Sequence, residues 1–208
     1  MKVLLINGSS NKNGCTFRAL TEIENILKKE KIETEIIQLG SNPIRDCIGC
    51  RGCAQNGNKC VFNEDIVNEI IEKAKTCDGF IFGSPVYYAH PSGRLLCVLD
   101  RVFYAGGKFL AYKPGAAVVS ARRAGTTAAI DVINKYFTIN NMPIVSSQYW
   151  NMVHGTKSED VEKDLEGLHV MKTIAKNMAW LLNSLKQNAH PEPEAKPMTN
   201  FIRWNSWH

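Results

Sequence analysis

The sequence lacks any long apolar stretch. No segment is long and apolar enough to span a bilayer, and the opening V-L-L-I-N-G is too short for the apolar part of a targeting peptide. A block of Lys or Arg is also missing, because the basic residues are scattered, so a nucleic-acid surface is not indicated. We therefore expect a cytoplasmic protein that binds neither a membrane nor a nucleic acid.

Several common functional motifs are absent too. The chain has no G-x-G-x-x-G fingerprint for a dinucleotide pyrophosphate and no G-x-x-x-x-G-K-[ST] loop of an NTPase. It contains no convincing Ser/His/Asp set and no convincing pair of carboxylates. The sequence therefore gives no support to a side-chain nucleophile or general base as the centre of the chemistry.

The length and composition favour one domain with a short appendage. The chain has 208 residues, 44% of them hydrophobic, which suffices for one buried core. The net charge of +5 is mild and would help to attract phosphorylated ligands. We expect a domain over residues 1–187 and a Pro-rich C-terminal arm over 188–208. Its apolar side chains favour docking on the domain or on a second subunit over simple disorder: Phe201, Ile202, Trp204 and Trp207.

Short apolar segments alternate with segments of helical periodicity. The pattern predicts strands over residues 3–6, 34–39, 79–82, 115–119 and 143–146. It predicts helices over 17–31, from 64 onward, and over 93–103, 126–137 and 158–185. This alternation indicates an α/β fold with a doubly wound, five-stranded parallel sheet of order 2-1-3-4-5. In such a sheet, ligands bind beyond the carboxyl ends of the strands.

The first predicted strand is followed by the loop G-S-S-N-K-N-G-C-T, which is rich in hydroxyl and amide side chains. Between a strand and a helix, such a loop directs backbone N–H groups and a helix N-terminus toward an anion. Its small size and its hydroxyls fit a single terminal phosphomonoester. The alternative is an ordinary polar turn in which Thr16 caps the helix.

Four of the seven cysteines lie close together, in a predicted insertion over residues 45–62. They are Cys47, Cys50, Cys53 and Cys60. The spacing C-x2-C-x2-C-x6-C can place four thiolates around one centre and suggests iron–sulfur or zinc ligation, although it crowds the middle thiol of a zinc site. The same spacing also allows a thiol–disulfide pair or a set of free thiols. The three remaining cysteines are isolated and are expected to serve in packing.

Three loops at predicted strand ends resemble those of a known family. They are G-S-S-N-K-N-G-C-T, G-S-P-V-Y-Y and S-A-R-R-A-G-T-T, after the first, third and fourth strands. Together they look like the flavin-contacting loops of the flavodoxin-like NAD(P)H-dependent FMN reductases, and the likeness extends to about Leu185. The cysteine run resembles the cluster motif of the iron–sulfur flavoproteins, a branch of this family.

The resemblance implies which residues bind the cofactors. The implied FMN-binding residues are Ser9, Ser10, Asn11, Asn13, Gly14, Cys15 and Thr16 in the first loop, Pro85, Val86, Tyr87 and Tyr88 in the second, and Ser120, Arg122, Arg123, Gly125 and Thr126 in the third. The two arginines would stabilise reduced flavin or hold the 2′-phosphate of NADPH, unless they are surface charges. The four clustered cysteines would hold a [4Fe-4S] cluster. Further candidates for a pocket wall or a subunit interface are Tyr149, Trp150 and His154.

The implied function is that of an FMN-dependent NAD(P)H oxidoreductase. Electrons would pass from reduced nicotinamide through FMN to a quinone, a flavin, an azo or nitro compound or a protein, with or without a [4Fe-4S] cluster on the way. A homodimer or homotetramer is implied, because the active site of this family commonly lies at a dimer interface. Two other hypotheses stand beside it: a non-enzymatic electron-transfer protein between protein partners, and a redox or metal sensor built on the cysteines.

Overall fold

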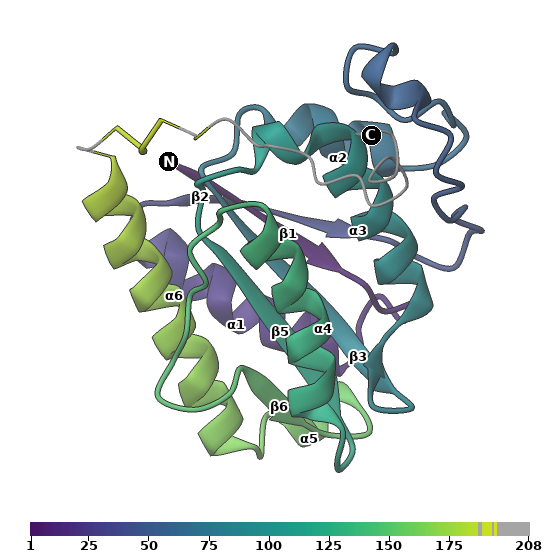
Figure 1. Ribbon diagram of the computed structural model, residues 1–208. Coiled ribbons are helices and arrows are strands. Elements are labelled where there is room, and N and C mark those ends of the chain that lie inside the picture. Colours follow the sequence, from purple (N-terminus) through teal and green to yellow (C-terminus); the bar gives the residue numbers. More distant parts are fainter. Residues whose placement is uncertain (187–188, 193, 195–208) are drawn as a thin grey trace, which may run out of the picture.

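The computed structural model describes residues 1–186, 189–192 and 194 (Figure 1). We predicted that the C-terminal arm docks because of four apolar side chains, and these lie outside the described residues: Phe201, Ile202, Trp204 and Trp207. Within the described part of the arm, the ring of His190 stacks on that of Tyr112, with centroids 4.3 Å apart.

A parallel sheet forms the centre of the molecule (Figure 1). Its strands are β1 Lys2–Asn7, β2 Glu33–Gln38, β3 Gly79–Tyr87, β4 His90–Pro91, β5 Gly115–Ala121 and β6 Met152–His154. Five of them pair in the order β2-β1-β3-β5-β6, while the short β4 pairs antiparallel with the end of β3. When only the parallel strands are numbered, the order is 2-1-3-4-5, and the predicted fold class is confirmed.

Helices cover both faces of this sheet (Figure 1). They are α1 Cys15–Lys29, α2 Val67–Ala74, α3 Gly93–Gly106, α4 Thr126–Ile139, α5 Ser158–Val161 and α6 Leu165–Leu185, with two short 3-10 helices, η1 Gly52–Ala54 and η2 Gly107–Phe109. The helices α1 and α6 pack on one face, and α2, α3 and α4 pack on the other. Throughout the described part of the chain, no helix has the length and apolarity needed to cross a membrane.

The central strand β1 contributes to both layers of the core, because successive side chains of a strand face opposite sides. Val3 and Leu5 belong to the layer under α1 and α6, and Leu4 and Ile6 belong to the layer under α2, α3 and α4. All four side chains are fully buried, and burial of each is worth about 1.5–3 kcal/mol. This packing fixes the strand from which the first loop departs.

The last parallel strand lies later in the chain than predicted. Residues 143–146 make only an isolated bridge, between Ile144 and Gly115, and the ladder with β5 is made by β6. The carbonyl of Pro143 accepts the backbone N–H of Gly115 at 2.9 Å, and Val145 donates to the carbonyl of Gly115 at 2.8 Å. The chain then leaves the sheet, and the buried Asn151 spans the gap by donating its side-chain amide to the carbonyl of Val145 over 3.2 Å.

The helix predicted over residues 158–185 is divided into α5 and α6. Asp164 caps the N-terminus of α6, and its carboxylate accepts the backbone N–H of Gly167 at 2.9 Å. The same carboxylate accepts the backbone N–H of His154 at 2.6 Å. A capping residue has non-helical backbone, so the helix cannot run through this position, and the break ties β6 to the start of α6.

Candidate functional site

A cavity of about 280 Å³ opens at the carboxyl ends of β1, β3 and β5, and we call it the switch-point cavity. Its lining residues are Ser9, Asn11, Gly14, Cys15, Thr16, Pro85, Val86, Tyr87, Ser120, Ala121, Arg122, Gly155 and Thr156. The three loops that carried the resemblance therefore meet around one space, at the position where doubly wound sheets bind ligands.

Most residues predicted to bind FMN line this cavity, but some do not. The predicted residues outside the lining are Ser10, Asn13, Tyr88, Arg123, Gly125 and Thr126. Conversely, Ala121, Gly155 and Thr156 line the cavity and were missed. The last two follow β6, and the sequence reasoning overlooked them because it placed the final strand at residues 143–146.

The aromatic candidates after the last predicted strand also lie outside this lining. The rings of Tyr149 and Trp150 pack edge to face with centroids 4.8 Å apart, and both side chains are about half exposed. The Nε2 atom of His154 lies 3.2 Å from the carbonyl oxygen of Arg123. His154 therefore connects β6 with the third loop rather than facing the switch-point cavity.

A series of side-chain turns holds the first loop. The backbone N–H groups of Ser9, Asn11 and Asn13 donate in turn to the side chains of Asn7, Ser9 and Asn11, each over 3.1 Å. Such Asx and Ser turns fix local backbone geometry. Asn7 is fully buried and donates to Gln38, which in turn donates to the carbonyl of Ser9 over 2.6 Å. The loop is thus held in shape by the protein alone.

The helix α1 begins beside this loop with an open N-terminus. Its N-cap is Gly14, and no side chain of the described residues caps it, so the alternative in which Thr16 is the cap is wrong. Uncapped N–H groups and the positive end of the helix dipole suit an anion. The Thr16 hydroxyl instead lies 2.8 Å from that of Ser120, which joins the first loop to the start of the third.

The second loop is a tight hairpin with a strained backbone. β3 and β4 are joined by Tyr88 and Ala89, whose φ angles are 51° and 59°. A two-residue turn with two positive φ angles favours Asn and Gly, and other residues there cost about 1–3 kcal/mol each. The third loop packs against this turn at Gly125, where an added Cβ would lie 2.7 Å from the Cα of Ala89.

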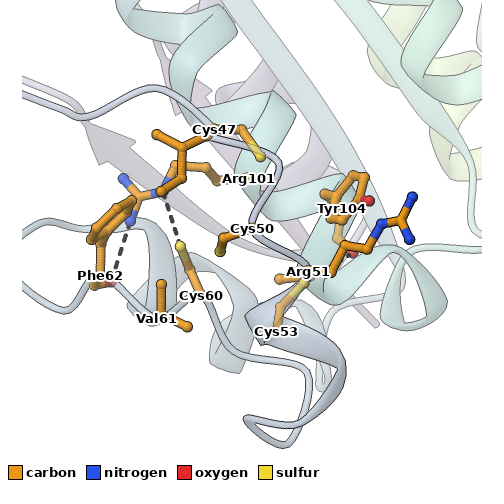
Figure 2. Close-up of a pocket in the computed structure, with 11 residues that line it drawn as sticks. Cys47, Cys50, Arg51, Cys53, Cys60, Val61, Phe62, Arg101 and Tyr104 are labelled. Carbon is orange, nitrogen blue, oxygen red and sulfur yellow. Dashed lines mark hydrogen bonds between the residues drawn. The ribbon is translucent and has the colours of Figure 1, made fainter.

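The four clustered cysteines line a second space, the cysteine pocket, which is bounded by the cysteine run and the C-terminal half of α3 (Figure 2). Its lining residues are Cys47, Ile48, Cys50, Arg51, Cys53, Cys60, Val61, Phe62, Arg101, Tyr104 and Ala105. The space measures about 20 Å³, and none of the described residues that line it carries a carboxylate. The donor set is therefore sulfur, with arginine as the nearby charge.

The thiols of this pocket are separate from one another. All seven cysteines of the chain are free, and Cys50 and Cys53 are not joined. Among the described residues, no group of three or more His, Cys, Asp or Glu side chains is arranged to hold one metal ion. A zinc site requires four ligands on one ion, whereas in a four-iron cluster each thiolate binds a different iron.

The cysteine run turns through left-handed backbone. Gly49 has φ 64°, a conformation that favours glycine, and Arg51 has φ 60° at the start of η1. Gly52 permits a close approach of two segments of the cysteine run. A Cβ at this position would lie 2.6 Å from Cγ1 of Val61.

Two side chains on neighbouring helices hold Cys60. Asn68 of α2 accepts the backbone N–H of Cys60 at 2.8 Å and donates to its carbonyl at 2.9 Å. Arg101 of α3 donates from Nε to the Cys60 sulfur over 3.2 Å (Figure 2). It also forms an ion pair with Asp65. Burial would lower the pKa of Arg101, but its bonds to Asp65 and Cys60 outweigh this and raise it. Neither Asn68 nor Arg101 was singled out from the sequence.

The three isolated cysteines lie outside the lining of the cysteine pocket. Burial raises the pKa of the thiols of Cys15, Cys77 and Cys97, which favours the uncharged form. Cys77 is fully buried in the core, whereas Cys15 lies at the edge of the switch-point cavity.

The doubly wound sheet, with a cavity at the carboxyl ends of its strands, defines a flavodoxin-like fold. The chain belongs to the NADPH-dependent FMN reductase family, whose model matches residues 1–157. It is 34% identical over 195 residues to an iron–sulfur flavoprotein of Methanocaldococcus jannaschii, a match that covers 90% of this chain and 100% of that one. It is 26% identical over 192 residues to an iron–sulfur flavoprotein of Methanosarcina thermophila, covering 90% and 98% of the two chains.

Solved structures share the fold at low sequence identity. The structure of RosB with bound 8-demethyl-8-formylriboflavin-5′-phosphate superposes with a TM-score of 0.69 at 12% identity, covering 97% of this chain and 92% of that one. A flavodoxin from the domain Archaea gives a TM-score of 0.58 at 15% identity, with coverage of 88% and 99%. The predicted family and fold are therefore confirmed.

Proposed function

We propose that the switch-point cavity binds FMN and that the protein uses it to pass electrons from NAD(P)H to an acceptor. The observation that carries this proposal is the convergence of three loops, distant in sequence, on one cavity of about 280 Å³. The uncapped N-terminus of α1 would receive the phosphate. We assign the remaining contacts to the residues that the resemblance implied, with Gly155 and Thr156 added from the structure.

The residues of the cavity suit a ligand with a charged end and a flat ring. Backbone N–H groups and hydroxyls gather in the first loop, whereas Pro85, Val86 and Tyr87 offer apolar area in the second. Arg122 also lines the cavity and would place a cation beside a ligand that becomes more negative on reduction. FMN, when bound, supplies the chemistry by accepting hydride from NAD(P)H and passing electrons on. The protein holds it, orients it and covers part of it from water.

We further propose that the cysteine pocket holds a [4Fe-4S] cluster. Support comes from the donor set, because Cys47, Cys50, Cys53 and Cys60 all line one pocket that contains no carboxylate. A [4Fe-4S] cluster is larger than the space of about 20 Å³ in this pocket, so the cysteine run must open to admit it. The similar proteins of the two archaea carry the name iron–sulfur flavoprotein, which adds weight to this assignment.

A homodimer or homotetramer remains our prediction for the assembly. The fully exposed Tyr88 at the hairpin tip and the half-exposed Tyr104 beside the cysteine pocket are aromatic surfaces that a second copy would cover.

A visible spectrum of anaerobically purified protein, with iron and sulfide analysis, tests both cofactors. We expect flavin bands at one FMN per chain, a broad additional shoulder, and about four irons and four sulfides per chain. A colourless protein that fails to bind added FMN would refute the flavin proposal. A purely flavin spectrum, with neither iron nor sulfide after reconstitution, would refute the cluster.

Steady-state oxidation of NADPH and NADH, with a quinone or ferricyanide as acceptor, tests the enzymatic proposal. We expect turnover well above that of free FMN at the same concentration. Turnover at the level of free FMN, in protein that holds its cofactors, would instead favour a carrier that exchanges electrons between protein partners.

A further inference from the structure

Arg101 is a charged side chain in the interior of the protein. It lies on α3, and its side chain is 1% exposed, although its neighbours on the same helix face are the apolar Val98 and Ala105. A guanidinium group in such a place is costly unless its donors are bonded and its charge is paired. The groups that bond to the Arg101 guanidinium should therefore indicate the role of this buried charge.

All of these partners belong to the segment around the cysteines. One terminal nitrogen donates to the carbonyl of Arg45 over 3.2 Å and pairs with the Asp65 carboxylate, and the other donates to the carbonyl of Phe62 over 3.2 Å. The Nε atom donates to the sulfur of Cys60 over 3.2 Å. Because Arg45 precedes the first cysteine of the run and Phe62 follows the last, one planar group joins both ends of it.

The bond to Cys60 also gives Arg101 an electronic effect on whatever that sulfur binds. A charged N–H donor withdraws electron density from a sulfur ligand and stabilises the more negative, reduced state, so it raises the reduction potential of a cluster. Asp65 holds the guanidinium in the plane from which it reaches both Cys60 and Phe62. Lysine could not do the same, because it offers one compact charge in place of a rigid fork.

We propose that Arg101 is the positioning residue of the cysteine pocket: it ties the two ends of the cysteine run together and sets the reduction potential of the cluster through Cys60. Only the effect on the reduction potential rests on the proposed function, because it requires a bound cluster. The clamp itself is a property of the protein and exists with or without a cluster.

The clamp is tested by hydrogen exchange and mass spectrometry on the full-length, FMN-loaded, iron-free protein. In Arg101→Lys, we expect amides of residues 44–62 to exchange about tenfold faster, with exchange in the first loop unchanged. Arg51→Gln is the matched control, because Arg51 lines the same pocket but its guanidinium points away from the sulfurs (Figure 2). Unchanged exchange in Arg101→Lys, or an equal increase in Arg51→Gln, overturns the clamp.

A second variant guards against a failure of Arg101→Lys to fold. Asp65→Asn keeps the guanidinium but removes the carboxylate that orients it. We expect faster exchange confined to the same segment, by a smaller factor than in Arg101→Lys. Wild-type exchange in Asp65→Asn would contradict the proposal.

The electronic effect is tested by redox titration of the reconstituted cluster. For Arg101→Lys we expect a lower potential, corresponding to about a tenfold change in the ratio of reduced to oxidised cluster, or about 59 mV for one electron. A potential equal to that of the wild type, or an equal shift in Arg51→Gln, overturns the tuning role. Absence of iron and sulfide from the reconstituted wild type would refute the cluster instead, and the exchange comparison would still decide on the clamp.

Discussion

Buried or half-buried polar side chains hold the two candidate sites in shape. Asn7 supports the first loop from beneath, and Arg101 and Asn68 fix Cys60 from two helices. Each of these contacts satisfies a group that would be costly to leave unpaired. The loops that would contact cofactors are therefore held by hydrogen bonds with residues outside those loops.

At the same scale, Gly125 links the third loop to the hairpin, and Gly125→Ala should weaken FMN binding. Its φ is +90°, and a new Cβ would lie 2.7 Å from the backbone of Ala89, so either the loop or the hairpin must move. We expect FMN affinity to fall about tenfold, or about 1.4 kcal/mol. Fluorescence titration of apoprotein with FMN measures the change.

Gly40→Ala provides the matched control. Gly40 also has a positive φ, +66°, but nothing lies within 4 Å of the position of its Cβ. This variant should lose about 1–2 kcal/mol of stability from backbone strain and keep wild-type FMN affinity. Equal affinity in the two variants would show that the third loop does not shape the FMN site.

The sequence allowed the loop residues of the candidate sites to be predicted, but not the distant side chains that hold those loops in place. The loop residues stand next to one another, so G-S-S-N-K-N-G-C-T is visible as a motif. The support from Gln38 to Asn7 spans 31 residues, and that from Arg101 to Cys60 spans 41. The signal that marks Arg101 is a charge on the apolar face of α3, which predicts a buried partner but does not identify it.

Among the elements, the strands with unbroken apolar runs were predicted correctly, whereas the last parallel strand, β6, was placed too early in the chain. β1, β3 and β5 lie where expected, because each is a continuous buried run. The edge strand was placed at residues 143–146, since the apolar run there exceeds that of Met152–His154. Only the structure shows that the chain leaves the sheet after the bridge at Ile144 and pairs with β5 again at β6, with Asn151 bonded to Val145 across the gap.

The edge strand β2 is fixed to its neighbours by Glu35, and Glu35→Gln should destabilise the protein at neutral pH. Its carboxylate bonds Lys73 of α2 at 2.8 Å and Lys2 of β1 at 2.9 Å. These two bonds, that from Lys73 foremost, lower the pKa of Glu35 below its ordinary 4.5. Because the side chain is partly exposed, we expect a loss of only about 0.5–1 kcal/mol.

The pH dependence of this loss follows from the lowered pKa. The folded state favours the charged carboxylate, so its contribution is present above 4.5 and is lost as the pH falls through the lower folded-state value. Urea unfolding of wild type and variant should therefore differ at neutral pH and converge in acid. Glu33→Gln is the control, since Glu33 is 70% exposed and lies 3.5 Å from Lys2. A difference that persists in strong acid would contradict the assignment.

On the scale of the whole molecule, the two candidate sites are separate. The switch-point cavity and the cysteine pocket have no lining residue in common. The first lies at the carboxyl ends of the strands, and the second lies beside the C-terminal half of α3. This separation predicts that damage to one site leaves the other intact.

Cys60→Ser should therefore remove the cluster and spare the flavin. We expect one FMN per chain and an affinity within about twofold of wild type, because Asn68 still holds the backbone at this position and Cys60 does not line the switch-point cavity. Iron analysis and FMN titration of the same preparation measure both effects. Gly125→Ala provides the reciprocal case, with weakened FMN and unchanged iron. Loss of FMN from Cys60→Ser would show that the two sites depend on one another.

The central place of β1 determines how the chain must fold. Its pairing with β3 brings together Lys2 and Asp78, which are 76 residues apart, and contacts between such distant segments form slowly. Until β3 docks, one edge of β1 is open, and its uncharged apolar residues 3–6 are suited to pairing with another molecule. The strand that anchors the finished sheet is thus also a segment through which a partly folded chain can aggregate.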